Sequence, residues 1–246
     1  MNISQTTRRV QRVRHEIHLR DVEVVGIAQP SANFIAVTFA GDALADFVSA
    51  SFDDHLKFIF STPAGEVLRR DYTPRRFDRQ QRTLTLEFAL HENGPASDWA
   101  RQAAAGQRAT LAGPRGSMII PMDYDWHLLA GDAAALPAIH RRLEELPAAA
   151  RAIVVVQTAD ASDRREFNSA AQPDVRWVAT PDELIAAVRG LALPDGEGFA
   201  WCAGEASTMA RLREVLVTEH AQPKEAMRVA AYWRHGTSNF HEELNP

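Results

Sequence analysis

The stretch Trp126-His-Leu-Leu-Ala-Gly131-Asp-Ala-Ala-Ala-Leu136 marks the point where the pattern of the chain changes. Its apolar first half predicts a buried strand that runs into a glycine turn, and a helix is expected over residues 136–146. The continuous apolar run at residues 152–156 is typical of a strand that is buried on both faces. This alternation of strands and helices predicts a parallel sheet with right-handed crossovers.

The same alternation continues toward the C-terminus, with strands expected at residues 175–178 and 199–203 and helices at residues 182–188 and 207–220. Upstream, the pattern is different. Short apolar strands are expected at residues 22–27, 34–39, 55–60, 83–90 and 107–111, with one helix at residues 95–104. Their spacing predicts an antiparallel barrel or sandwich. We therefore divide the chain into a β-barrel domain, residues 1–122, and an α/β domain, residues 123–246.

Composition narrows the class of protein. The 246 residues carry a formal net charge of -5, which argues against a general nucleic-acid binder. No stretch is apolar enough for a membrane helix, so we expect a cytoplasmic protein without membrane insertion. The single cysteine, Cys202, excludes an intrachain disulfide and is expected to be a small buried residue. The histidines form no metal-ligand pattern, so no metal site is predicted.

Basic residues are unevenly distributed. Lys57 and Lys224 are the only lysines, so arginine supplies every other basic side chain. An arginine cluster occupies the first twenty residues, and we interpret it as a solvated or partly ordered leader, the alternative being a basic arm. Its members are Arg8, Arg9, Arg12, Arg14 and Arg20.

Two segments of the first domain have features that suit a flavin. Residues 69–75, Arg-Arg-Asp-Tyr-Thr-Pro-Arg, place cations, an aromatic ring and a hydroxyl on a strand, although a solvated edge strand would look similar. Residues 91–100 turn at Gly94 into a helix, and we expect the N–H groups of Ala96, Ser97 and Asp98 to be free for a pyrophosphate. An ordinary capped helix, with Trp99 in the core, is the alternative.

Further motifs follow in a fixed order along the chain. Together with the two segments above, they resemble the siderophore-interacting protein family, most of all its NADPH-dependent ferric-chelate reductases. The resemblance runs from about Gln11 to about Gly236 and implies a ferredoxin-reductase-like architecture, with an FAD-binding barrel and an NAD(P)H-binding parallel-sheet domain. The matching motifs are Arg70-Asp-Tyr-Thr-Pro-Arg75, His91-x-x-Gly-Pro-Ala-Ser-x-Trp-Ala100, Ala112-Gly-Pro-Arg-Gly-Ser117, Leu129-Ala-Gly-Asp-x-x-Ala-Leu-Pro-Ala138 and Ala231-Tyr-Trp-Arg234.

The resemblance also implies roles for individual residues. The flavin strand corresponds to Arg70, Asp71, Tyr72 and Thr73, and the pyrophosphate and adenine side to His91, Ala96, Ser97 and Trp99. The turns that face the pyridine nucleotide correspond to Gly131, Asp132, Ala135, Gly204 and Glu205. A basic cluster that would attract an anionic ferric siderophore corresponds to Lys57, Arg115 and Arg234. No residue is assigned an acid–base catalytic role.

The choice of pyridine nucleotide depends on the strand that ends at Gln157 and on the loop after it. Arg164 and Arg165 could contact a 2′-phosphate, whereas Asp160 and Asp163 count against one. We expect NADPH, with NADH possible. The glycine turn at Gly131 lacks two glycines of the common dinucleotide fingerprint, so it gives little support by itself.

These implications predict a reductase that passes electrons from NADPH through FAD to Fe(III) in a siderophore, expected to be of the catecholate type, and releases Fe(II). Two alternatives remain open. One is a general NAD(P)H:flavin or acceptor oxidoreductase. The other is an FAD-bearing siderophore-binding protein that is reduced by ferredoxin.

Overall fold

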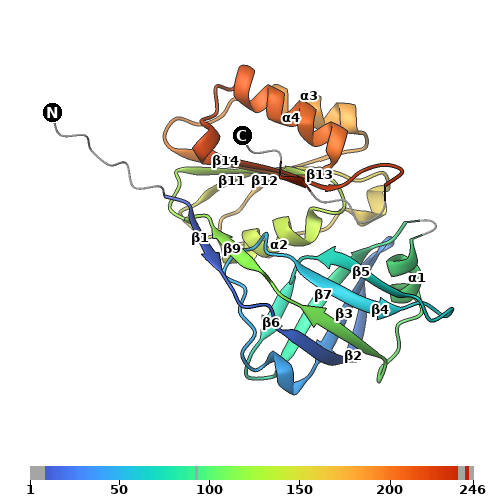
Figure 1. The fold of residues 1–246 in the computed structure, drawn as a ribbon. Coiled ribbons are helices and arrows are strands. Elements are labelled where there is room, and N and C mark those ends of the chain that lie inside the picture. The colour runs from blue at the N-terminus through green and yellow to red at the C-terminus, as the bar shows by residue number, and fades with distance from the viewer. Residues whose placement is uncertain (1–8, 92–93, 238–241, 244–246) are drawn as a thin grey trace.

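Two sheets of different kinds are stacked one above the other in the computed structural model, which describes residues 9–91, 94–237 and 242–243 (Figure 1). Over these residues, the lower sheet is a seven-stranded antiparallel barrel sheet in the order β5-β4-β8-β2-β3-β7-β6. Its strands are β2 (Leu19–Ser31), β3 (Phe34–Ala40), β4 (Leu56–Ser61), β5 (Val67–Tyr72), β6 (Arg76–Asp78), β7 (Thr83–Ala89) and β8 (Arg108–Ala112).

The barrel core follows the alternation that the sequence predicts for β7. Leu84, Leu86 and Phe88 are fully buried, because successive side chains of a strand point to opposite faces. Helix α1 (Pro95–Arg101) packs Trp99 onto the same core. The helix is shorter than expected, because Gln102 leaves helical dihedral angles and its N–H already bonds inside the last turn.

The upper sheet confirms the predicted parallel architecture. Its order is β12-β11-β10-β13-β14, all parallel, with β15 antiparallel at the edge. Within the described residues, none of its helices is long and apolar enough to span a membrane. The elements are β10 (Trp126–Gly131), α2 (Leu136–Glu145), β11 (Arg151–Gln157), β12 (Asp174–Val178), α3 (Pro181–Arg189), β13 (Gly198–Glu205), α4 (Ala206–Thr218), β14 (Met227–Trp233) and β15 (Glu242–Glu243).

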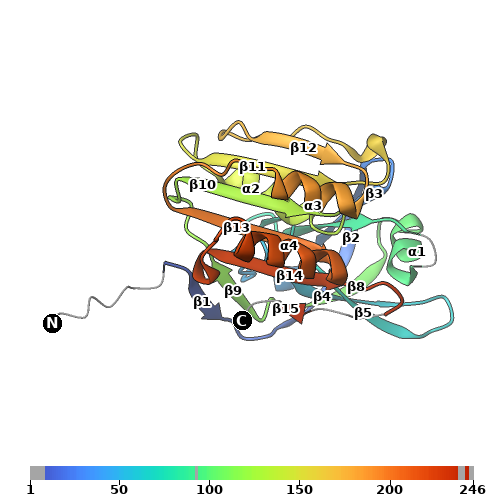
Figure 2. The ribbon, with the colours of Figure 1, turned by 90° about the horizontal axis from the view of Figure 1, so that it is seen from above.

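Both faces of the parallel sheet are covered, which explains its apolar strands. Leu128 points to the side of α3 and α4, while its neighbour Leu129 points to the side of α2. Figures 1 and 2 show α3 and α4 on the outer face, and Figure 1 shows α2 between the two sheets. Cys202 is buried on the α3/α4 side, where burial raises the pKa of its thiol to about 12, as expected for a packing residue.

The leader, expected to be solvated or partly ordered, has ordered structure from Arg9 onward, while Arg8 lies outside the described residues. Arg9 forms ion pairs with Asp123 and Glu197 and lies 4.1 Å from the ring centroid of Tyr124. Strand β1 (Gln11–Arg14) then pairs with β9 (Gly116–Ile119). Arg20 is buried and binds Asp46 at 2.8 Å. The leader folds because its backbone and charges find partners between 26 and 188 residues farther along the chain.

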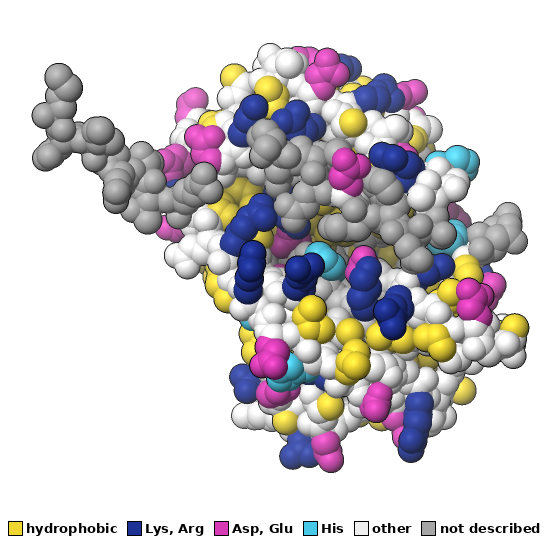
Figure 3. Space-filling view, in the orientation of Figure 1, with side chains coloured by type: hydrophobic (Ala, Val, Ile, Leu, Met, Phe, Trp, Pro, Cys, Tyr) yellow, Lys and Arg dark blue, Asp and Glu magenta, His cyan; other side chains and the backbone are white. Residues whose placement is uncertain are grey.

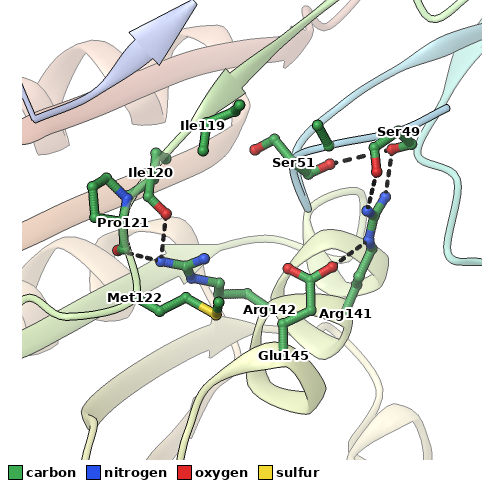
Figure 4. Close-up of a pocket in the computed structure, with 10 residues that line it drawn as sticks. Ser49, Ser51, Ile119, Ile120, Pro121, Met122, Arg141, Arg142 and Glu145 are labelled. Atoms are coloured by element: carbon green, nitrogen blue, oxygen red, sulfur yellow. Dashed lines mark hydrogen bonds and ion pairs between the residues drawn. The ribbon is translucent and has the colours of Figure 1, made fainter.

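Two arginines of α2 tie the domains together around a cavity of about 260 Å³ (Figure 4). Arg141 donates to Ser49 Oγ at 2.8 Å and to its carbonyl at 3.1 Å. Arg142 donates to the carbonyl oxygens of Ile120 and Pro121 at 3.1 and 2.8 Å. Both guanidinium groups are used in these hydrogen bonds between the domains. We therefore interpret the cavity as part of the domain junction.

Candidate functional site

The register of β5 against β4 separates the side chains of the expected flavin strand. Arg70 lies opposite Phe58, and Tyr72 lies on the same face of β5 as Arg70, toward the aromatic core. Asp71 lies on the other face, opposite Lys57, and its Oδ2 accepts from Lys57 Nζ at 2.7 Å. Two residues with different expected roles, a flavin contact and a substrate cation, thus form one ion pair.

Tyr72 and Thr73 lie where β5 meets the core. The Tyr72 ring centroid is 4.4 Å from that of Phe88 and 5.9 Å from that of Phe58. Burial raises the pKa of the Tyr72 phenol, so the group stays neutral. Thr73 is buried directly after the strand. A ring and a hydroxyl at the end of β5 match the groups that the sequence proposes for a flavin.

The segment before α1 is organised by Ser97. Its Oγ accepts from the His91 N–H at 3.2 Å, and the imidazole lies so close to Gly94 that a Cβ there would be 2.2 Å from His91 Cε1. The expectation of a free Asp98 N–H is wrong, because this group donates to the Gly94 carbonyl at 2.8 Å in the first helical turn. Ala96 and Ser97 are buried.

The Asp98 carboxylate, which would repel a phosphate if it pointed inward, is exposed and accepts from Arg101 at 2.9 Å. A cleft of about 480 Å³ lies between the end of β4 and α1. Trp99 lines this cleft and is otherwise packed in the barrel core, with its ring centroid 4.7 Å from that of Phe58. Trp99 therefore belongs to the barrel core and also lines the cleft, so its two expected roles are compatible.

In the α/β domain, Asp132 organises the turn after β10. Its Oδ1 accepts from the Ala134 N–H at 2.9 Å, and its Oδ2 accepts from the Glu205 N–H and from Trp233 Nε1, both at 2.8 Å. Burial raises the pKa of Asp132, although these hydrogen bonds act in the opposite direction. Asp132 thus joins the carboxyl ends of β10, β13 and β14.

Glycines permit this close approach of strand ends. A Cβ at Gly204 would lie 2.6 Å from Asp132 Oδ2, and one at Gly131 would lie 2.6 Å from the Cβ of Ala135. Glu205 caps α4, since its carboxylate accepts from the Ser207 N–H at 2.7 Å. Burial opposes ionisation of Glu205, but hydrogen bonds from Ser207 and its neighbours lower its pKa.

The loop after β11 corrects one expectation about the nucleotide. Arg165 does not face an open phosphate site, because it donates to Glu87 Oε2 of the barrel at 2.7 Å and lies over the Phe34 ring. Glu87 is buried, so its carboxylate needs a compensating positive charge, which Arg165 supplies. Asp163 is buried and accepts from the Asn33 N–H at 2.8 Å. Arg164 remains exposed.

The expected substrate cations lie along the seam between the sheets. Lys57 lies opposite Ala112 in the β4–β8 pair, and the turn that carries Arg115 follows Ala112 directly. Arg234 follows β14, whose carboxyl end lies above β4 and β5 in both ribbon views (Figures 1 and 2), and it contacts Glu242 Oε2 at 3.4 Å. Figure 3 shows Lys and Arg side chains gathered along this seam.

The chain is 32% identical to the NADPH-dependent ferric-chelate reductase of Escherichia coli, over 94% of this chain and 99% of that protein. The chain belongs to the siderophore-interacting protein family. The family's matches cover residues 124–236, siderophore-interacting protein, and residues 62–118, siderophore-interacting FAD-binding domain.

Other members of the siderophore-interacting protein family agree over most of the chain. Ferric vibriobactin reductase of Vibrio cholerae is 29% identical over 87% of this chain and 89% of its own length. A siderophore utilization protein from T. fusca superposes with a TM-score of 0.89 at 32% identity, covering 94% of this chain and 98% of that one.

The fold of this family member extends to more distant proteins. The ferredoxin reductase of carbazole 1,9a-dioxygenase superposes with a TM-score of 0.65 at 18% identity, over 86% of this chain and 68% of that one. This likeness confirms the ferredoxin-reductase-like fold that the sequence predicts.

Trp233 belongs to the motif Ala231-Tyr-Trp-Arg234, and the sequence pattern predicts no role for it. Its indole is 42% exposed at the end of β14, while its Nε1 is fixed on the buried Asp132. A large aromatic residue that is exposed at the carboxyl edge of a parallel sheet is the feature that could have indicated a role in ligand binding.

Proposed function

We propose that this protein is an FAD-containing ferric-siderophore reductase that passes electrons from NADPH to Fe(III) in a siderophore. The observation that carries the proposal is the 32% identity, along nearly the whole chain, to an NADPH-dependent ferric-chelate reductase. The geometry supports it, because the flavin-strand residues and the nucleotide-turn residues lie at the ends of β5 and β10, next to the domain junction.

The residues present suit a flavin. Arg70 and Tyr72 share one face of β5, which suits a cation for the pyrophosphate and a ring beside the isoalloxazine. Thr73 supplies a hydroxyl for a ring nitrogen. The cleft between β4 and α1 is lined by Trp99 and suits the adenine side; Asp98 also lines it, and its charge is compensated by Arg101.

When bound, the flavin accepts the two electrons of one hydride and releases them singly, so that one NADPH and two ferric chelates yield NADP⁺, a proton and two ferrous ions. The protein binds and orients both reactants. Asp132, Gly204 and Glu205 shape the turn for the nicotinamide, and Trp233 offers an aromatic surface beside it. No acid–base residue is needed at the iron, because only an electron is transferred there.

The substrate class follows from charge. A ferric tris-catecholate is a trianion, and the cations along the seam would attract it. The similarity to a ferric vibriobactin reductase also favours a catecholate. We place the reaction in the cytoplasm and keep NADH or ferredoxin as alternative donors.

The first test is anaerobic stopped-flow reduction of the FAD-loaded protein. NADPH should bleach the flavin absorbance, and a ferric tricatecholate should restore it. Reduction by ferredoxin and not by either nicotinamide would favour the ferredoxin-dependent alternative. Reoxidation by many acceptors at equal rates would favour a general oxidoreductase, and a protein that fails to bind added FAD would overturn the proposal.

A further inference from the structure

The cations of the expected substrate cluster differ in their partners. Lys57 is bound to Asp71 at 2.7 Å, and Arg234 contacts Glu242 at 3.4 Å. Asp71 Oδ1 is buried without a hydrogen-bond partner in the described part of the chain, so Lys57 is the cation that this carboxylate faces. A cation paired with a carboxylate attracts a distant anion only weakly, because the two charges nearly cancel beyond the pair.

Arg115 is in a different state. Its side chain is exposed, and within the described residues its guanidinium has no ion pair or hydrogen bond. It therefore keeps its full charge at the seam, directly after the strand end that lies opposite Lys57.

Arg14, on the N-terminal strand, is a second exposed arginine of this kind. Within the described residues it too has no ion pair or hydrogen bond of its guanidinium. It lies opposite Gly116 in the β1–β9 pair, and the next residue, His15, donates its N–H to the Arg115 carbonyl at 2.9 Å. Arg14 and Arg115 therefore belong to the two chain segments of one ribbon, one position out of register with each other.

The ribbon gives Arg14 a fixed and open position. Gly116 carries no side chain that could cover it, and a Cβ at Gly116 would lie 2.6 Å from the Val13 carbonyl oxygen. Arg9 anchors the start of the strand on Asp123. Each of the two exposed arginines lacks an acidic partner within the described residues, so an anion beside either one gains an uncompensated positive charge and a charge-assisted hydrogen bond.

We propose that Arg14 and Arg115 are the principal contacts for the anionic ferric chelate; this inference rests on the proposed function. Lys57 and Arg234 contribute less to binding, because their charges are paired with Asp71 and Glu242. The N-terminal strand thus contributes a substrate-binding residue that none of the matched motifs contains. The ligand class is a polyanionic chelate such as a ferric tricatecholate.

The test measures equilibrium binding of gallium(III) tricatecholate, a redox-inactive trianion, to the FAD-loaded protein at low ionic strength. Arg14→Gln should weaken binding about threefold to fivefold and reduce its salt dependence, because one unit charge near a trianion is lost. Arg115→Gln should act similarly, and Lys57→Gln less. A neutral gallium trihydroxamate should be insensitive to Arg14→Gln.

The matched control is Arg151→Gln. Arg151 is also exposed, but it begins β11 and so lies at the amino end of the parallel sheet, whereas Arg234 follows the carboxyl end of β14. The inference is overturned if Arg14→Gln behaves like Arg151→Gln, or if Lys57→Gln has the largest effect. Binding of the gallium chelate needs no electron donor, so this test does not depend on reductase activity. The reductase activity is tested separately, by adding the ferric chelate to protein that has been reduced with NADPH or with dithionite.

Discussion

At the scale of single residues, Gly131 shows how one position can serve packing where a motif suggests only ligand binding. A Cβ on Gly131 would lie 2.2 Å from the Ala203 carbonyl oxygen, which is backbone and cannot move aside. The glycine therefore lets β10 and β13 approach at their carboxyl ends. Glycine is needed there whether or not a nucleotide phosphate is present.

Gly131→Ala should lower the free energy of unfolding by about 1–3 kcal/mol, as overpacked sites do. Urea denaturation of the apoprotein measures it. Gly190→Ala is the control, since a Cβ there would be 3.4 Å from its nearest neighbour, the Ala186 carbonyl oxygen, and should cost little. Equal losses in the two variants would show that the strand contact is not tight.

At the scale of elements, local pattern predicted some segments and missed others. The alternation of residues in β7 and the apolar run in β11 were sufficient to predict these two strands, because each pattern depends on residues that are close in the sequence. β1 was missed, since its exposed residues show no alternation and it pairs with β9 more than a hundred residues later. β14 was not predicted as a strand, and its end entered only as the motif Ala231-Tyr-Trp-Arg234.

Helix α3 gives a prediction at this scale. Thr180 caps it by accepting from the Glu183 N–H at 3.2 Å, and Glu183 reaches back to the Ala179 N–H at 2.8 Å. Thr180→Ala should cost about 1 kcal/mol of stability, while Thr180→Ser, which keeps the hydroxyl, should cost much less. Thermal and urea unfolding check both variants. A serine variant as unstable as the alanine variant would mean that the methyl group, and not the cap, matters.

At the scale of the whole molecule, buried and partly buried ion pairs connect the domains. Arg75 donates to both oxygens of Glu144, at 2.7 and 2.8 Å, and Glu87 receives Arg165. No local pattern could predict these pairs, because each joins residues about seventy to eighty positions apart. The pairing of Lys57 with Asp71 depends on the register of β4 against β5, so the sequence could single out Lys57 by its rarity but could not predict its partner.

His140 makes this junction sensitive to acid. It lies 3.5 Å from Glu144, and burial, together with the nearby Arg75, lowers its pKa to about 4. The folded state therefore holds His140 neutral, while the unfolded chain takes up a proton near the ordinary histidine pKa of about 6.5. The unfolded state binds more protons between these values, so stability should fall as the pH drops from about 6.5 toward 4.

The variant that tests this is His140→Gln, which stays neutral at every pH. Wild-type protein should lose about 1–2 kcal/mol more than the variant between pH 6.5 and pH 4, after allowance for the partial exposure of the ring. Urea midpoints measured across this range give the two slopes, and the comparison of slopes is independent of any constant loss caused by the substitution. Because Glu144 is common to both proteins, its own titration cancels to first order. Parallel slopes would assign the acid sensitivity to another group, of which His127, also with a pKa of about 4, is the first to examine.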